Sequence, residues 1–102
     1  MRLENESEKL VKGKILAIIG KYLDLSKYRV FFFGSRVSGK GNEFSDIDVG
    51  IEGKEALPLR VLGEITDEIE ELPILYKIDV VDFNRVNEGF KAVAKQHIEF
   101  VN

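Results

Sequence analysis

The segment "GSRVSGKGNEFSDID" at residues 34–48 constrains this chain more than any other stretch. It follows an aromatic and β-branched run, "KYRVFFF" at 27–33, which is typical of a strand buried on both faces. It leads into the alternating run "SDIDVGIEG" at 45–53, where Asp46 and Asp48 share one face and apolar residues share the other. The sequence therefore predicts two strands joined by a glycine-rich turn that ends in a pair of carboxylates.

Two phosphate-binding interpretations compete for the start of this segment. Gly34 to Lys40 fit the P-loop pattern G-x-x-x-x-G-K-[ST], but Gly41 stands where a P-loop has the hydroxyl that binds Mg²⁺. A P-loop also needs a helix that begins at its lysine, whereas a strand-like alternation follows here. The favoured interpretation is a turn in which Gly34 and Ser35 approach a phosphate while the following aspartates bind a metal ion.

The aspartate pair itself predicts a cation site. Carboxylates at positions i and i+2 of a strand point the same way and repel each other in the absence of a cation. Asp46 and Asp48 therefore favour a hard divalent cation, Mg²⁺ or Mn²⁺. A two-metal site needs further ligands, and Asp79 is our third candidate, because it interrupts an apolar run where an unpartnered charge is costly. Asp82 lies three positions later, so we expect it on the opposite face, in a turn or helix cap.

Other residues near these positions have two interpretations each. Arg36 and Lys40 can add positive charge to the phosphate site, or be solvated charges of the loop. The lone His97 is expected to be a packed or rim histidine rather than a metal ligand. We expect Phe31 to Phe33 to be aromatic residues of the core rather than a stacking platform for a base.

The rest of the chain predicts helices around a small sheet. Apolar residues at helical spacing indicate helices within 5–23 and 84–101, and between Pro58 and Pro73. The run "ILYKIDVVDF" at 74–83 indicates a third strand. We therefore expect the order α, β, β, α, β, α and an α+β fold with a small mixed sheet of three to four strands and flanking helices.

Composition excludes several classes of function. A length of 102 residues fits one domain, residues 1–102. The absence of cysteine excludes disulfides, thiolate catalysis and zinc bound by sulfur. The formal charge of −3 disfavours direct binding of nucleic acid. A polar N-terminal stretch and the lack of a long apolar run predict a cytoplasmic protein that has no contact with a membrane.

On the motifs "GSRVSGKGNEFSDIDVGI" and "KIDVVDF" the chain resembles the minimal nucleotidyltransferase (MNT) domains of the DNA polymerase beta superfamily, which are commonly paired with HEPN-domain proteins. The resemblance covers nearly the whole chain and implies the palm-like nucleotidyltransferase fold. It implies two groups of site residues, which are Gly34, Ser35, Arg36 and Lys40 for a nucleoside triphosphate and Asp46, Asp48 and Asp79 for two Mg²⁺ ions and catalysis.

The resemblance also implies a role for the chain. MNT antitoxins of HEPN/MNT pairs transfer AMP from ATP to a tyrosine of the HEPN toxin. The complete set of three acids favours such an enzyme, and the short chain disfavours a small-molecule acceptor such as an aminoglycoside, which needs an additional domain. The alternative is a non-catalytic MNT subunit that neutralises a HEPN-type partner by binding alone.

Overall fold

A computed structural model describes residues 3, 7–39 and 45–102. Lys40, a candidate for the phosphate site, lies outside the described residues. The helices are α1 (Glu8–Ile19), α2 (Ser35–Ser38), α3 (Leu59–Glu70) and α4 (Glu88–Ala94), and the strands are β1 (Arg29–Phe33), β2 (Ile47–Glu52), β3 (Ile78–Asp82) and β4 (Glu99–Phe100). No helix among these residues is long and apolar enough to cross a membrane.

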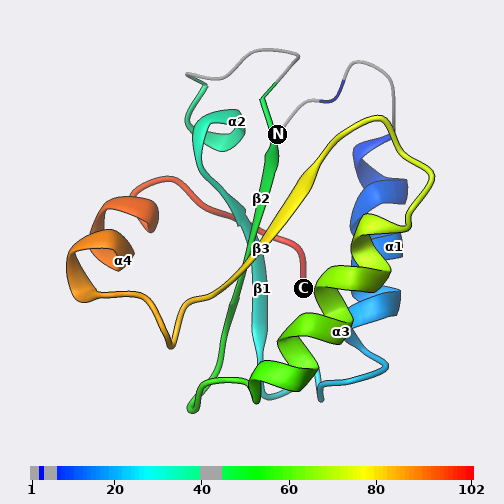
Figure 1. Ribbon diagram of the computed structural model, residues 1–102. Coiled ribbons are helices and arrows are strands. Elements are labelled where there is room, and N and C mark those ends of the chain that lie inside the picture. The colour runs from blue at the N-terminus through cyan, green and yellow to red at the C-terminus, as the bar shows by residue number, and fades with distance from the viewer. Residues whose placement is uncertain (1–2, 4–6, 40–44) are drawn as a thin grey trace.

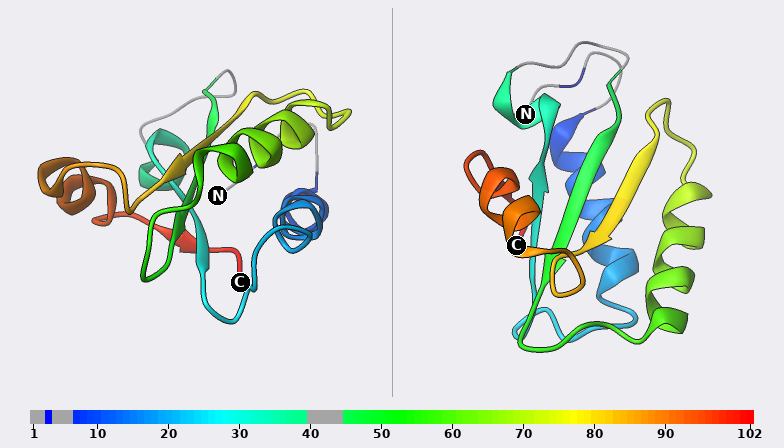
Figure 2. Two further views of the ribbon diagram at one scale, coloured as in Figure 1. Left: turned by 60° about the horizontal axis from the view of Figure 1, so that its bottom comes forward. Right: turned by 60° about the vertical axis from the view of Figure 1, so that its left-hand side comes forward.

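The four strands form one mixed sheet in the order β3-β2-β1-β4. β1 is antiparallel to both β2 and β4, whereas β2 and β3 are parallel. Helices α1 and α3 cover one face of the sheet, at the right of the strands in Figure 1, and α4 covers the other face. Figure 2 shows the same separation from two further directions. The predicted α+β class with a small mixed sheet is therefore confirmed.

Alternation along β1 supplies two hydrophobic cores. Val30 and Phe32 pack with the residues of α1 and α3, while Phe31 and Phe33 pack with Phe83 on the α4 side. These four side chains of β1 are buried and only Arg29 is exposed, so the prediction of a strand buried on both faces is confirmed. Neighbouring residues of a strand point to opposite faces, and for this reason one apolar strand can serve both layers.

Strand β2 places different chemistry on its two faces. Ile47, Val49 and Ile51 are fully buried in the core beneath α1 and α3. Asp48 and Glu52 alternate with these residues and lie on the face that α4 covers. The predicted separation of apolar and acidic faces is therefore confirmed for β2, and Asp46 lies just before the strand begins.

The prediction of one helix over 84–101 is wrong for its second half. The side chain of Asn87 caps α4 by accepting a 2.7 Å hydrogen bond from the Phe90 amide, and the helix ends at Ala94. The chain then forms β4, where Phe100 pairs with Phe31. Helical spacing cannot predict this strand, because β4 forms only where β1 offers an open edge. The short helix α2 was also not predicted.

Candidate active site

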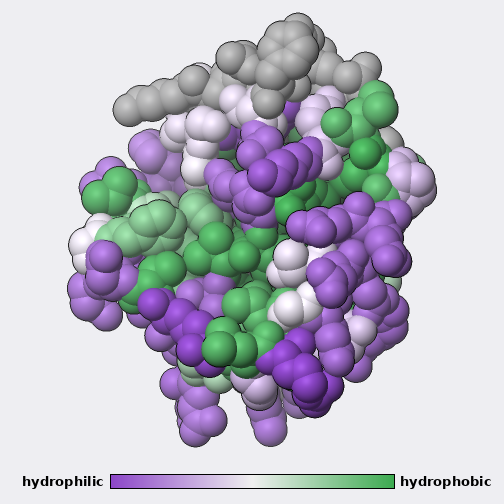
Figure 3. Space-filling model, in the orientation of Figure 1, coloured by the Kyte–Doolittle hydropathy of each residue, from purple (hydrophilic) through white to green (hydrophobic). Residues whose placement is uncertain are grey.

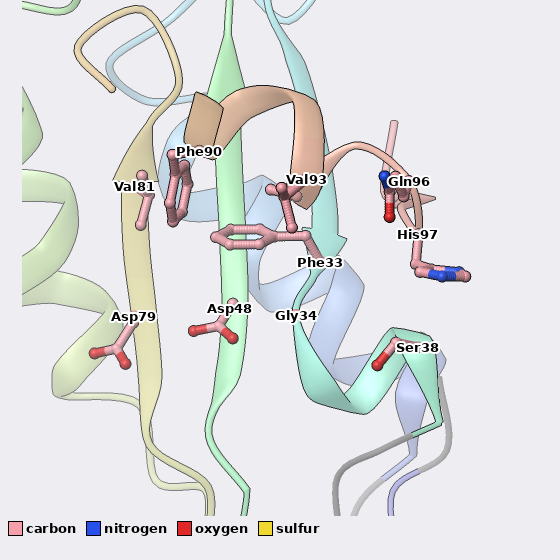
Figure 4. A pocket seen from close by; sticks show the side chains of 11 residues that line it. Phe33, Gly34, Ser38, Asp48, Asp79, Val81, Phe90, Val93, Gln96 and His97 are labelled. Carbon is pink, nitrogen blue, oxygen red and sulfur yellow. The ribbon is translucent and has the colours of Figure 1, made fainter. Parts of the chain in front are cut away.

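The candidate site lies on the α4 face of the sheet, where three neighbouring strands bring one residue each into a row. Asp48 of β2 pairs with Phe33 of β1 on one side and with Asp79 of β3 on the other. Figure 4 shows the two carboxylates side by side on adjacent strands. The two aspartates are 31 positions apart in the sequence, and parallel pairing of β2 and β3 is what brings them together.

Gly34 closes the row at the end of β1. Its φ of 82° and ψ of −161° belong to a region that is almost limited to glycine. A Cβ atom placed on Gly34 would lie 2.2 Å from Asp48 Oδ2. Both the backbone conformation and the space beside Asp48 therefore require glycine here, and the structure brings the predicted turn and the predicted acid into direct contact.

The electrostatics of this row centre on Asp48. Burial raises the pKa of the Asp48 carboxyl above its usual value of 3.8, and the charges of Asp79 and Asp46 raise it further. Because each cause disfavours the ionised form, a cation bound near Asp48 would lower the cost of its charge. Carboxylate oxygens are also the donors that Mg²⁺ prefers. The donor set therefore fits a hard divalent cation.

Within the part of the chain that the structure describes, no three acidic or histidine side chains converge closely enough to hold a metal ion as they stand. Asp48 and Asp79 lie together, while Asp46 precedes β2 and is exposed. The side chain of Asp79 is 44% exposed, and Lys77 Nζ lies 3.8 Å from its Oδ1. Nothing in the local pattern singled out Lys77 beyond its position two residues before Asp79.

Asp82 lies apart from these acids, as its spacing predicts. It is 3% exposed, and its Oδ2 accepts a 2.8 Å hydrogen bond from the Leu57 amide. Its Oδ1 accepts a 2.9 Å hydrogen bond from the Asn84 amide, which is the turn chemistry expected from the sequence. Arg85 Nε lies 3.5 Å from Oδ2 and adds a positive charge. Asp82 therefore has a structural role on the opposite face, where it holds Leu57 and the turn at Asn84 by hydrogen bonds. Asp79 remains the candidate third acid.

A pocket of about 650 Å³ opens at this row, and its walls differ in character. Polar groups occur where the turn and the strands meet, and apolar side chains from the sheet and α4 form the rest (Figure 4). The lining residues are Gly34, Ser38, Asp48, Asp79, Phe33, Val81, Phe90, Val93, Ala94, Gln96 and His97. The exposed His97 is a rim residue, as predicted.

The wall formed by α4 was not predicted as part of the site. Phe90 and Val93 follow the helical spacing of a buried stripe, yet they are 42% and 67% exposed because they border the pocket. Phe90 contacts Phe33 and Phe83, with ring centroids 6.1 and 5.8 Å apart. Spacing alone gave the helix but could not distinguish a core stripe from a pocket wall.

Ion pairs hold α4 against the sheet. Glu52 Oε2 of β2 lies 3.0 Å from Lys91 Nζ, and Glu52 also forms an ion pair with Lys95. Burial acts to raise the pKa of Glu52, but the hydrogen bonds from Lys95 and Lys91 prevail and lower it. The acid at this end of β2 is therefore neutralised by α4, which fixes the apolar wall of the pocket in place.

The two remaining candidates for the phosphate site occupy α2. Ser35 is the first residue of α2 and is half-buried. Arg36 donates from Nε to the Ser45 carbonyl at 2.6 Å, and its guanidinium lies 4.6 Å from the centroid of the Tyr76 ring. Neither Ser35 nor Arg36 lines the pocket. The structure thus brings Gly34, Asp48 and Asp79 together and directs Arg36 elsewhere.

Comparisons with known proteins identify the family of this chain. Residues 13–101 match the family described as "Polymerase beta, Nucleotidyltransferase". The chain is 28% identical over 88 residues to a probable protein adenylyltransferase MntA of Haemophilus influenzae, which covers 84% of this chain and 77% of that protein.

Solved structures share the fold at low sequence identity. A toxin–antitoxin structure with AMP-PNP has a TM-score of 0.71 and 17% identity, and covers 89% of this chain and 72% of that one. A structure of a tri-AMPylated HEPN toxin of Shewanella oneidensis in complex with an MNT antitoxin has a TM-score of 0.71 and 16% identity. The match covers 94% of this chain and 72% of that one. The resemblance expected from the two motifs is confirmed, and this chain belongs to the polymerase beta nucleotidyltransferase family.

Proposed function

We propose that this chain, as a single domain over residues 1–102, transfers AMP from ATP to a tyrosine hydroxyl of a HEPN-domain partner and acts as the antitoxin of that pair. The observation that carries the proposal is the pairing of Asp48 with Asp79 directly beside Gly34. The related protein from H. influenzae is named a probable protein adenylyltransferase, and structural neighbours include an MNT antitoxin with an AMPylated HEPN toxin. Both support the assignment of reaction and partner.

Gly34, Ser35 and the three predicted acids each have a role in this proposal. Gly34 has no side chain, so a triphosphate can approach the turn beside Asp48, and the Ser35 hydroxyl donates to a phosphate oxygen. Asp46, Asp48 and Asp79 would hold two Mg²⁺ ions, which would supply positive charge for the transfer. Asp46 belongs to this set through its proximity to Asp48, whose pKa it raises.

The transfer balances as a single substitution at phosphorus. The acceptor oxygen forms a bond to the α-phosphorus of ATP, the bond from that phosphorus to the bridging oxygen breaks, and pyrophosphate leaves. Asp79 takes the proton of the acceptor hydroxyl. Its partly exposed carboxylate is within reach of a group that a partner presents from outside.

The surface around the pocket fits a protein acceptor. Figure 3 shows hydrophobic surface over α4 and the adjoining part of the sheet. Phe90 and Val93 are exposed there at the edge of the pocket. An apolar border of this kind suits the ring of a tyrosine delivered by a folded partner better than it suits a small, highly polar acceptor.

The experiment is label transfer from ATP labelled at its α-phosphate to a purified HEPN-domain partner, with and without Mg²⁺. We expect label on the partner with the wild-type chain, and a loss of at least about a hundredfold in Asp46→Asn and Asp48→Asn, since both remove a charged ligand. Asp67→Asn, an exposed change on α3, is the matched control and should retain full activity.

The same experiment separates catalysis from binding alone. If the partner is bound and silenced but acquires no label, the chain is a non-catalytic subunit and the enzymatic proposal is wrong. Equal label with the wild-type chain and the Asp48→Asn variant would also contradict it, because transfer would then not depend on the row of acids. Mass spectrometry of the partner identifies the modified residue and tests the choice of tyrosine.

A further inference from the structure

Arg36 connects the three segments that carry the candidate site. It follows Ser35 in the turn, and its Nε donates a 2.6 Å hydrogen bond to the carbonyl of Ser45, the residue before Asp46. Its guanidinium also lies over the ring of Tyr76, three residues before Asp79. One side chain that extends from the turn therefore contacts both the entry to β2 and the entry to β3.

We propose that Arg36 is a positioning residue that holds these three segments in register, and that it is not a ligand of the triphosphate. The inference rests on the proposed nucleotidyl transfer and assigns to Arg36 a role different from the phosphate contact expected from the sequence.

The environment of the guanidinium favours this role. Tyr76 is only 8% exposed and belongs to the core beneath α1 and α3, so the ring under Arg36 is a fixed surface. Arg36 itself is half-buried, and its side chain is directed to the Ser45 carbonyl and the Tyr76 ring. A planar guanidinium suits the arrangement, because it can stack on a ring while an edge N–H donates to a carbonyl.

A second contact shows that the same two strand entries are already close. The Ile47 amide donates a 2.9 Å hydrogen bond to the Lys77 carbonyl, which ties the start of β2 to the start of β3. This bond fixes the strands to each other but does not reach the turn. Arg36 adds the turn to this pair, so Gly34 and Ser35 keep their places relative to the aspartates.

The test compares Arg36→Lys, which keeps the charge, with Tyr76→Phe, which keeps the ring, and Tyr76→Leu, which removes it. We expect Arg36→Lys and Tyr76→Leu to lower kcat by about ten- to a hundredfold while the KM for ATP changes by less than about threefold. Tyr76→Phe should retain most of the activity. The double variant Arg36→Lys/Tyr76→Leu should be no worse than Arg36→Lys alone, because both changes break one unit.

The matched control is Arg60→Lys, an exposed change on α3 that should leave kcat unaltered. Thermal melting of each variant shows whether the fold is retained. A wild-type kcat in Arg36→Lys, or a rise in KM without a fall in kcat in Arg36→Met, would overturn the inference, since a phosphate ligand behaves in this way. Fully additive losses in the double variant would overturn it too.

An NMR measurement tests the inference independently of the reaction. In the Arg36→Lys variant we expect backbone amide shifts to change at Asp46 and Asp79 as well as in the turn. Changes confined to the immediate neighbours of Arg36 would contradict a positioning role. If the wild-type chain transfers no label, the proposed function fails, whereas the amide shifts still decide whether Arg36 links the three segments.

Discussion

Replacing Gly34 with alanine tests the closest approach in the candidate site. Gly34 adopts φ 82° and ψ −161°, and an alanine there carries a backbone cost of about 1–3 kcal/mol. The added Cβ would also lie 2.2 Å from Asp48 Oδ2 and 3.1 Å from Asp48 Cγ. The carboxylate is the end of a side chain, so the clash is relieved by rotating Asp48 away from its place opposite Asp79.

We therefore expect Gly34→Ala to affect stability and activity for different reasons. The cost of the backbone conformation at residue 34, together with about 0.5–1.5 kcal/mol for the displaced rotamer of Asp48, should destabilise the fold by about 2–4 kcal/mol. For a domain of this length the melting temperature should fall by roughly 10 °C or more. Transfer of AMP should fall by at least about a hundredfold, because the Asp48 carboxylate no longer lies opposite Asp79 in the candidate site.

The chain supplies a matched control in Gly39. Its φ of 81° also belongs to the left-handed half of the map, but a Cβ there would meet nothing within 4 Å. Gly39→Ala should cost only about 1–2 kcal/mol and keep most of the activity. Circular dichroism melts and the label-transfer assay on both variants separate the backbone strain from the displacement of Asp48.

A double-mutant cycle completes the test. In the Asp48→Ala background the atoms that meet the new Cβ first are gone, so the stability penalty of Gly34→Ala should shrink toward that of Gly39→Ala. An equal penalty in both backgrounds would refute the contact between Gly34 and Asp48. So would a Gly34→Ala variant that transfers AMP within about threefold of the wild-type rate.

Three further predictions follow from charges in the fold. Asp48→Asn should raise the melting temperature at pH 7 while activity falls at least about a hundredfold, because the raised pKa of Asp48 means that its ionised form destabilises the fold. The stability gain should shrink as pH falls through the pKa of Asp48, and an unchanged or lower melting temperature at pH 7 would contradict the reasoning. Asp82→Asn should destabilise the fold by about 1–3 kcal/mol in denaturant unfolding, since an amide cannot replace both oxygens toward Leu57 and the following turn. The hydrogen bond to Glu68 raises the pKa of Tyr22 to about 12. Glu68→Gln should therefore move the absorbance titration of Tyr22 down toward 10. In the wild-type chain, the stability that this hydrogen bond contributes is lost as pH rises through 12.

Much of the site could be predicted because its residues stand out locally. The run "KYRVFFF" indicates a strand buried on both faces, and the alternation from Asp46 onward indicates which side of β2 carries acid. The two-residue alternation of a strand also predicts that Asp79 and Asp82, three positions apart, face opposite sides. The structure places them on opposite faces as expected. These inferences depend on neighbours in the sequence, so the sequence was sufficient for them.

The rest depends on contacts between distant segments, which no local pattern encodes. β4 exists because β1 offers an edge to residues 99–100, although the same stretch continues a helical spacing. Arg36 stands in a loop where sequence allows either a phosphate contact or a solvated charge, and only the approach of Ser45 and Tyr76 decides its direction. The exposure of Phe90 likewise follows from where α4 ends on the sheet.

The two acids on the α4 face of β2 show how this fold separates structure from chemistry. Glu52 and Asp48 are four positions apart on the same face of one strand, yet Lys91 and Lys95 lower the pKa of Glu52, whereas burial and neighbouring acids raise the pKa of Asp48. The chain's own lysines neutralise one end of this strand face, whereas negative charge is concentrated at the other end, as expected of a site that binds a cation. Gly34 lies beside Asp48 and is the residue where we expect a triphosphate to approach, so the end of β2 that carries the unneutralised acid is also the end expected to bind substrate.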